Sequence, residues 1–268
     1  MNNKKQSIAE IFPKTIGAVL LLLTVATSLA GWYLPDGMNW AVVLLLIVAF
    51  FLLTGKALTG RGLGILINDR NLMSLSRLQL VIWTTVIVSG FFVIALVRIK
   101  SADVDQPLAI GVPWQIWTLL GISATSFVGT PLLYGNKMAK EPRDPAKIEN
   151  EVASQFANET ADKVAENRRG ILYANNGIED ARFTDMFQGD ELVNTHLVDV
   201  AKLQMFFFTI AVAIAYATQL FQLIAYGDLK QTGIHLPDLQ EGLLALMGVS
   251  HAGYLGSKSI DKTPATQT

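Results

Sequence analysis

The sequence predicts an all-α protein: a polytopic transmembrane helical bundle of about six spans, with a duplicated two-helix unit and a small helical cytoplasmic insert. Three observations predict this. Hydrophobic residues make up 51% of the 268 residues and charged residues only 16%, whereas roughly a quarter of the residues in soluble domains are charged. The charges crowd between long windows that hold almost none, as expected where lipid surrounds those windows. Short motifs also recur in the same order in two pairs of windows.

Five windows are predicted to span the membrane, and a sixth is weaker. A helix of about 20 residues, rising about 1.5 Å per residue, covers the roughly 30 Å hydrocarbon core. The five windows are residues 15–34, 38–53, 78–99, 113–134 and 203–226, and the sixth is residues 239–256. In the sixth, Glu241 and His251 flank only a short apolar run. A helix lying on the membrane surface is therefore the alternative there.

The first window has a second interpretation, as a cleaved signal peptide. Lys4 and Lys5 supply a positive n-region, and Ser28-Leu29-Ala30 is similar to a small-x-small cleavage site. Cleavage does not invert the rest of the chain, because the chain after residue 30 starts outside in either case.

Lysine and arginine predict the orientation of the spans. They gather before the first window, between the second and third, after the fourth and after the sixth. These residues are Lys4, Lys5 and Lys14; Lys56, Arg61, Arg70 and Arg77; Lys137, Lys140, Arg143 and Lys147; and Lys258 and Lys262. The opposite loops hold only Arg98, Lys100 and Lys230. Six spans with both chain ends in the cytoplasm satisfy this pattern.

The predicted parts follow in chain order. They are an N-terminal transmembrane hairpin (1–56), a cytoplasmic connector (57–77), a first transmembrane repeat (78–134), a cytoplasmic insert (135–201), a second transmembrane repeat (202–257) and a disordered C-terminal tail (258–268).

The duplication is predicted from two matched pairs of motifs. The third window begins Arg77-Leu78-Gln79-Leu80 and the fifth begins Lys202-Leu203-Gln204-Met205, each with a Thr five residues after the Gln. The fourth contains Gly121-Ile-Ser-Ala-Thr-Ser-Phe-Val-Gly129, and the sixth contains Gly248-Val-Ser-His-Ala-Gly-Tyr-Leu-Gly256. Because each unit has two spans, the copies should share one orientation. Chance resemblance between apolar helices is the alternative.

Two sets of residues within the repeats are candidates for packing or for a pore. Small residues spaced by four leave one stripe of the helix surface without large side chains. A neighbouring backbone can therefore approach that stripe closely in lipid. In one interpretation these stripes pack the two repeats against each other. In the other they face another subunit or line a pore. Their members are Gly121, Thr125, Gly129, Gly248, Ala252 and Gly256. A possible polar lining consists of Gln79, Thr84, Gln204 and Thr209. Interfacial positions, with the amides reaching headgroups or water, are the alternative for the glutamines.

The insert is the largest soluble region. Ile148, Val152, Phe156 and Val164 recur at helical spacing and predict an amphipathic helix over residues 146–168, and a short helix is predicted over 183–192. Phe183, Met186 and Phe187 are candidates for docking a partner or the membrane surface. About 65 residues form a marginal core, so the insert should dock on something. Asp185, Asp190 and Glu191 are interpreted as solvated charge, because no calcium-loop pattern surrounds them.

Composition excludes several kinds of chemistry. The chain has no cysteine, only three scattered histidines and a net charge of −1. We therefore expect no cofactor, no metal site and no nucleic-acid partner. Ser250 and His251 are adjacent on one helix and point about 100° apart, so they cannot pair locally as nucleophile and base. Proton-driven transport is disfavoured, because Glu241 and His251 are placed near the ends of their span.

The runs Ser74-Leu-Ser-Arg-Leu-Gln-Leu-Val-Ile-Trp-Thr84 and Asp199-Val-Ala-Lys-Leu-Gln-Met-Phe-Phe-Phe-Thr209, together with the run from Gly248 to Gly256, resemble a pattern of uncharacterised bacterial polytopic inner-membrane proteins. These motifs cover the third to sixth spans. The resemblance implies a location in the bacterial inner membrane and assigns no functional residue.

The functional hypothesis is a non-enzymatic integral membrane module that anchors or assembles a complex through its cytoplasmic insert. Its expected partners are membrane lipid, a second copy of the chain, or a membrane or cytoplasmic protein. The alternative is an oligomeric channel or pore-forming subunit, and an intramembrane hydrolase at Ser250 comes third.

Overall fold

The computed structural model describes residues 14–101, 103–156 and 160–266. Lys4 and Lys5, on which the signal-peptide and orientation predictions depend, lie outside these residues, as do the last two residues of the predicted tail. The described chain is mostly helical, and this confirms the all-α fold class.

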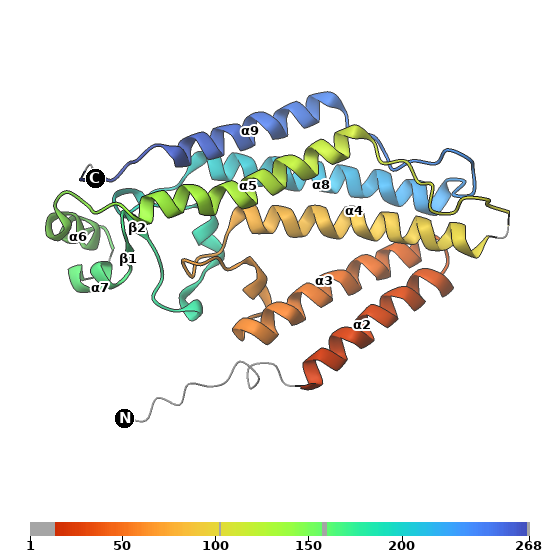
Figure 1. Ribbon diagram of the computed structural model, residues 1–268, viewed down its shortest axis with the longest axis horizontal. Helices are drawn as coiled ribbons and strands as arrows, with labels where there is room; N and C mark the ends of the chain where they lie inside the picture. The colour runs from red at the N-terminus through yellow and green to blue at the C-terminus, as the bar shows by residue number, and fades with distance from the viewer. Residues whose placement is uncertain (1–13, 102, 157–159, 267–268) are drawn as a thin grey trace. The chain divides into compact units, whose positions relative to one another are not determined.

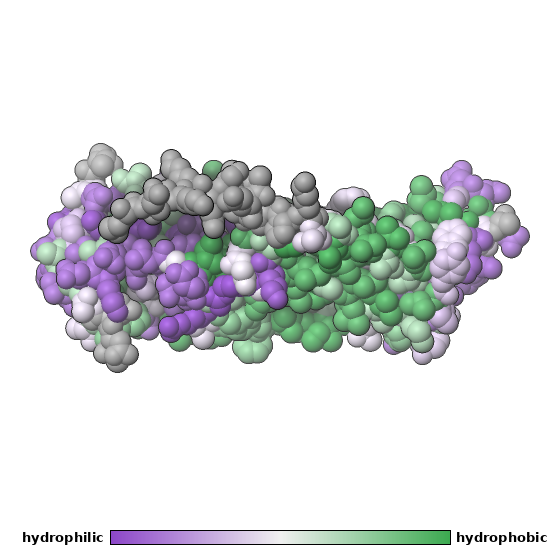
Figure 2. Space-filling view, turned by 90° about the horizontal axis from the view of Figure 1, so that it is seen from below, coloured by the Kyte–Doolittle hydropathy of each residue, from purple (hydrophilic) through white to green (hydrophobic). Residues whose placement is uncertain are grey.

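Five helices are long and apolar enough to cross a membrane (Figure 1), and they coincide with the five predicted windows. They are α2 (Lys14–Tyr33), α3 (Met38–Thr59), α4 (Leu75–Lys100), α5 (Trp114–Met138) and α8 (Val200–Tyr226). Figure 2 shows hydrophobic side chains over a long stretch of the visible surface and hydrophilic side chains gathered elsewhere on it. The apolar helices indicate a membrane protein. Helix α9 (Glu241–Ser259) occupies the sixth window but is not among the five.

The chain divides into two compact units. Unit 1 consists of Met1–Ile65, Val81–Trp117 and Val212–Leu239, and unit 2 consists of Leu66–Leu80, Thr118–Ala211 and Gln240–Thr268. Helices α4, α5 and α8 each contribute residues to both units.

Unit 1 packs around large buried side chains. The indole Nε1 of Trp40 in α3 donates a hydrogen bond to Oγ of Ser89 in α4 at 3.0 Å. Gly90 lets α4 and α8 approach closely, because a Cβ there would lie 2.3 Å from Cδ2 of Leu220. Arg98 is buried and donates hydrogen bonds to four carbonyl oxygens in the segments that follow α4 and α8.

In unit 2, the insert is a small helical structure with its own core. Helices α6 (Pro145–Ser154) and α7 (Ala161–Glu166) precede an antiparallel hairpin of β1 (Arg168–Arg169) and β2 (Leu172–Tyr173). The 3₁₀ helices η2 (Ile178–Asp180), η3 (Phe183–Phe187) and η4 (Leu192–Asn194) follow. The buried side chains of Ile148, Val152, Val164 and Leu192 form the core. The one helix predicted over 146–168 is therefore two, and the helix predicted over 183–192 is two 3₁₀ helices.

The connector and the tail are also held in place. The connector contains the 3₁₀ helix η1 (Gly62–Leu66), which is followed along the chain by an antiparallel β-bridge between Ile67 and Met73. In unit 2 the tail packs on the insert, where Ala265 forms a bridge with Pro142 and Thr263 is buried (Figure 1). Thr263 is thus buried in a tail that the sequence predicts to be disordered, whereas most residues from 260 to 266 are exposed.

Candidate functional site

Asp190 of the insert lies at the centre of a buried group of charges in unit 2. Its Oδ1 accepts hydrogen bonds from Nη2 of Arg70 at 2.8 Å and from Nζ of Lys202 at 2.9 Å. The hydroxyl of Tyr134 donates to the same oxygen at 2.7 Å. Oδ2 lies 3.3 Å from Nζ of Lys258, which also donates to the Tyr134 hydroxyl. One carboxylate therefore pairs with three cations and a phenol.

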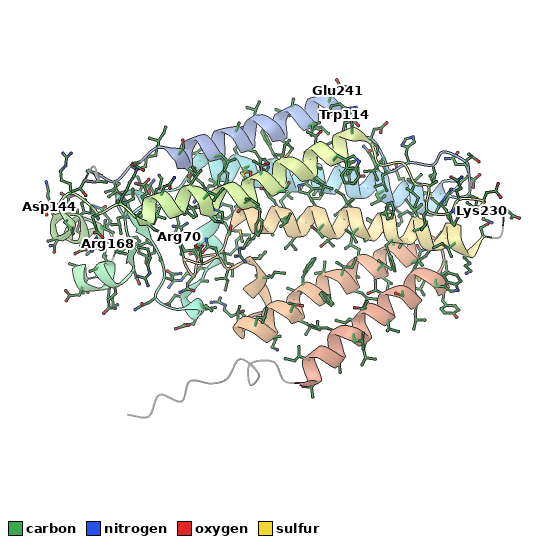
Figure 3. All side chains as sticks on the ribbon, viewed as in Figure 1. Arg70, Trp114, Asp144, Arg168, Lys230 and Glu241 are labelled. Carbon is green, nitrogen blue, oxygen red and sulfur yellow. The ribbon has the colours of Figure 1, made fainter. Side chains whose placement is uncertain are left out.

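The partners of Asp190 come from four different segments. Arg70 belongs to the connector (Figure 3), Tyr134 to the end of α5, Lys202 to the first turn of α8 and Lys258 to the last turn of α9. A lysine in the first turn of a helix is repelled by the helix dipole. The ion pair with Asp190 compensates for the repulsion between Lys202 and the helix dipole.

Glu191 makes a second set of contacts beside the first. Nζ of Lys137, near the end of α5, donates to Oε1 of Glu191 and, at 2.8 Å, to the carbonyl oxygen of Ile260. Oε2 accepts from the backbone N–H groups of Lys262 at 2.8 Å and Thr263 at 2.5 Å. Two neighbouring acids thus fasten the insert to the connector, three helix ends and the tail. We call this group the clamp, and its side chains are Arg70, Tyr134, Lys137, Asp190, Glu191, Lys202 and Lys258.

The clamp keeps Asp190 charged. Burial alone would raise the pKa of Asp190, but Lys202, Lys258 and Arg70 outweigh burial and hold that pKa well below its ordinary value. The side chain of Glu191 is only 2% exposed. The sequence interpretation as solvated charge therefore does not hold for these two acids, nor for Asp185, which is also buried. A carboxylate that is buried and ionised requires the paired cations found here.

Polar side chains on α5 and α9 lie beside each other in three successive pairs within unit 2. We call these pairs the polar ladder. Ser126 is hydrogen-bonded to His251 and Lys258 to Tyr134, whereas Thr130 lies beside Tyr254 but its Oγ1 has no hydrogen-bond partner among the described residues. Oγ of Ser126 lies 2.6 Å from Nδ1 of His251. The residues follow one another at intervals of three or four, so each set lies on one helix face. The ladder leads from Ser126, the middle residue of α5, to the clamp.

Several buried polar atoms beside the ladder lack a partner. Oγ of Ser123, Oγ of Ser250 and Nε2 of His251 have no hydrogen-bond partner among the described residues. His251 is 3% exposed and lies well inside α9, not near its end as the sequence suggests.

The structure brings together only part of the predicted polar lining. Nε2 of Gln79 donates to Oγ1 of Thr209, and both side chains are buried in unit 2. Gln204 is exposed, and Thr84 is half-buried in unit 1.

The predicted small-residue stripes lie largely open. A methyl group at Gly121 or Gly256 would meet nothing within 4 Å, and Thr125 and Ala252 are exposed. A Cβ at Gly129 would lie 3.8 Å from Leu255, and one at Gly248 would lie 3.9 Å from Ile122. No neighbouring backbone therefore uses the clearance at these glycines within the described residues.

Of the three predicted docking residues, one is well exposed. Phe183 is 46% exposed, Phe187 is half-buried and both stack edge-to-face on Phe206 of α8. Met186 is 1% exposed and belongs to the interior of unit 2, so it does not contribute to a docking surface.

The insert also contains a polar cleft of ≈ 350 Å³. Its lining includes Asn167, Tyr173, Asn175, Arg182, Gln188 and Thr195. Oγ1 of Thr195 is buried and has no hydrogen-bond partner among the described residues. Amides and hydroxyls supply both donors and acceptors, so the cleft suits a polar occupant.

A Ser–His pair does form, but across helices and with a different serine from the one considered in the sequence. Ser126 pairs with His251, whereas Ser250 does not. A hydrolase needs a group that orients the imidazole. Nε2 of His251 has no such partner among the described residues, so the pair lacks the third member of a triad.

Sequence reasoning missed the clamp and Ser126. A signal for the ladder exists, because Ser123, Ser126, Thr130, Tyr134 and Lys137 are spaced by three or four along α5. That spacing places them on one face of a helix otherwise suited to lipid.

No protein-family model, curated protein or solved structure matches this chain.

Proposed function

We propose that the chain is a non-enzymatic module of the bacterial inner membrane that anchors or assembles a protein complex through its insert. The observation that carries the proposal is the clamp. Burying ionised groups costs free energy, and an insert that is joined to the spans by flexible linkers does not require buried charges. By contrast, a platform that presents a partner site at a fixed position beside the spans requires such an attachment.

The proposed topology has six spans, with the insert and both chain ends in the cytoplasm. Lys137, Lys202 and Lys258 all lie at helix ends that the clamp joins to the insert. Clustered positive residues mark the cytoplasmic side. Helix α9 is the sixth span in this proposal. Its polar side chains Ser250, His251, Tyr254 and Lys258 lower its hydropathy but are all buried.

A duplication with parallel copies is part of the proposal. Along the ladder, residue numbers rise toward the clamp in both α5 and α9, as expected for two copies in one orientation. The matched Ser123 and Ser250 are both buried and both lack a partner among the described residues. The matched Gln79 and Gln204 differ, since only Gln79 is buried.

The partner is proposed to be a cytoplasmic protein that places a polar, extended segment in the cleft of the insert. Backbone N–H and C=O groups of such a segment can bond to the amides of Asn175 and Gln188 and to the hydroxyl of Thr195. Charges of both signs, including Arg182 and Asp180, line the cleft and favour no strongly charged ligand.

The experiment is site-specific photo-crosslinking of the full chain in its native membrane. A photoreactive residue at Gln188, in the cleft, should give a discrete adduct with a cytoplasmic protein. The matched control is Lys147, which is exposed on α6 and does not line the cleft. Point substitution is preferable to deleting the insert, because deletion would also remove both acids of the clamp.

Binding in the cleft also predicts that Thr195→Val removes the adduct at position 188, because valine is isosteric but lacks the hydroxyl. Membrane insertion, measured by alkaline extraction, should stay unchanged. Adducts of equal yield from positions 188 and 147, or no adduct from position 188, would count against the proposal.

An oligomeric channel is the second candidate, and the open stripes favour it. Gly121, Thr125, Ala252 and Gly256 leave room for a second copy of the chain. Liposomes containing purified protein should then conduct ions, and Gln79→Leu should change the current. Electrically silent bilayers with correctly assembled protein would contradict this candidate.

A further inference from the structure

The polar ladder is difficult to explain as simple packing. A polar group buried in hydrocarbon without a partner costs several kcal/mol, and polar residues at membrane depth are usually functional. Ser126 is flanked by about 18 Å of helix on either side within α5, at 1.5 Å rise per residue. The pair of Ser126 and His251 therefore lies far from either end of that helix.

Unpartnered polar atoms occur along the ladder from its deep end to Thr130, whose Oγ1 has no partner among the described residues. Ser123, Ser250 and His251 are each less than a tenth exposed, and each has a polar atom without a protein partner among the described residues. In native proteins such atoms are almost always satisfied, commonly by bound water.

At its other end the ladder reaches small polar cavities. A cavity of ≈ 10 Å³ is lined by Ser74, Tyr134, Tyr254, Lys258 and Asp190, among others. A second, of ≈ 20 Å³, is lined by Tyr134, Lys137, Asp190, Glu191 and Lys258, among others. Volumes of this order hold about one water molecule each when several polar groups line them.

A polar connection links the cavities to the second pair of the ladder. The Tyr254 hydroxyl lies beside Ser76, whose Oγ is 3.0 Å from Oγ of Ser74 in the lining of the smaller cavity. His251 lies one helical turn before Tyr254 on the same face of α9. The titratable groups that line the two cavities are Arg70, Tyr134, Lys137, Asp185, Asp190, Glu191, Asp199, Lys202, Tyr254, Lys258 and Lys262.

We propose that the interior of unit 2 is a water-binding site, in which bound water along the ladder gives His251 access to protons from solvent at the clamp. The ligand is water and the transferred species is a proton. Bound water and the hydroxyls of Thr130 and Tyr254 pass the proton on, each donating one hydrogen while accepting another, so that no group changes its net bonding. This site is separate from the cleft and does not depend on the proposed partner.

The test is hydrogen–deuterium exchange at the C2 position of histidine, measured by mass spectrometry on the full chain in mild detergent. This exchange requires water at the imidazole. The exposed His196 and His235 are internal controls. Measurable exchange at His251 is expected, despite its burial. No exchange at His251 while both controls exchange would overturn the proposal.

Two variants separate the ladder from general opening of the fold. Tyr254→Phe removes a hydroxyl from the ladder and should slow exchange at His251 while leaving His196 unchanged. Tyr216→Phe is the matched control, because Tyr216 is a buried tyrosine of unit 1 outside the ladder. Unchanged exchange at His251 in Tyr254→Phe, or equal slowing in Tyr216→Phe, would contradict a route through the ladder.

Discussion

At the scale of single residues, two acids of the insert have opposite electrostatic environments. Cations hold the pKa of Asp190 well below its ordinary value against the effect of burial. The pKa of Asp185 is raised, chiefly by burial, although its Oδ2 accepts from the backbone N–H groups of Arg182 at 2.8 Å and Met73 at 3.3 Å. The same loss of charge should therefore have opposite consequences at the two positions.

We expect Asp190→Asn to destabilise the protein and Asp185→Asn not to. Removing the Asp190 charge leaves three buried cations without their shared anion, and breaking a buried ion pair costs about 3–5 kcal/mol. An asparagine at 185 can keep an acceptor oxygen for both N–H groups and avoids burying a charge. The midpoint of thermal unfolding in detergent measures the stability of both variants. Equal midpoints for the two variants would contradict this account of the clamp.

The contribution of Asp190 should depend on pH only in acid. Its pKa in the folded state is depressed, so the stability it contributes is fully present above its unfolded pKa of about 3.9. That contribution is lost as pH falls from there toward the folded pKa. The stability difference between wild type and Asp190→Asn should thus not shrink as pH falls from 7 to 5. A difference that already shrinks between those values would refute the assignment.

There is a physical reason why the clamp cannot be predicted from the sequence. Arg70 and Asp190 are 120 positions apart, and Tyr134 and Lys258 are 124 apart. Each charged member lies in a loop or near a helix end, where charges are ordinarily solvated or interfacial. Only the folded connections between segments show that these charges are buried.

At the scale of elements, the apolar windows locate the spans well but not their ends. The second window ends at residue 53, whereas α3 continues to Thr59 and stops at Gly60, which adopts a left-handed conformation. Backbone hydrogen bonding continues past the edge of an apolar window until a residue such as this ends it. Similarly, Thr160 caps α7 by accepting from the N–H of Lys163, so two helices replace the single one predicted.

Arg98 illustrates how one side chain fixes two loops of unit 1. It donates to the carbonyl oxygens of Gln106 and Pro107 after α4 and to those of Leu229 and Gln231 after α8. Its guanidinium satisfies all four with its fixed set of donors.

Arg98→Met should loosen the segment around Lys230, which is exposed (Figure 3). Trypsin should cleave after Lys230 faster in this variant, because the carbonyls on both sides lose their donor. Lys100→Met is the control, since Lys100 is exposed and bonds only to the carbonyl of Trp32 among its described partners. Cleavage at the wild-type rate in Arg98→Met would show that Arg98 does not hold the loop.

At the scale of the whole molecule, the sequence predicts a helical membrane protein, and the structure confirms that much. The clamp and the ladder are absent from the prediction because both depend on contacts between distant segments. The clamp shows that the insert is attached to the ends of α5, α8 and α9 and is not a loosely linked domain. The clamp and the ladder also assign the polar residues of α9 to the protein interior, which favours its interpretation as a sixth span.

We propose that the apolar helices cross the membrane and that the insert is on the cytoplasmic side. The chain has no native cysteine, so single cysteines can test this with a membrane-impermeant maleimide in intact spheroplasts. Asn150→Cys lies on exposed α6 of the insert, and Asp36→Cys lies in the exposed turn between α2 and α3. The account predicts labelling at position 36 only, with both positions labelled after permeabilisation. Labelling at position 150 but not at 36 in intact spheroplasts would contradict it.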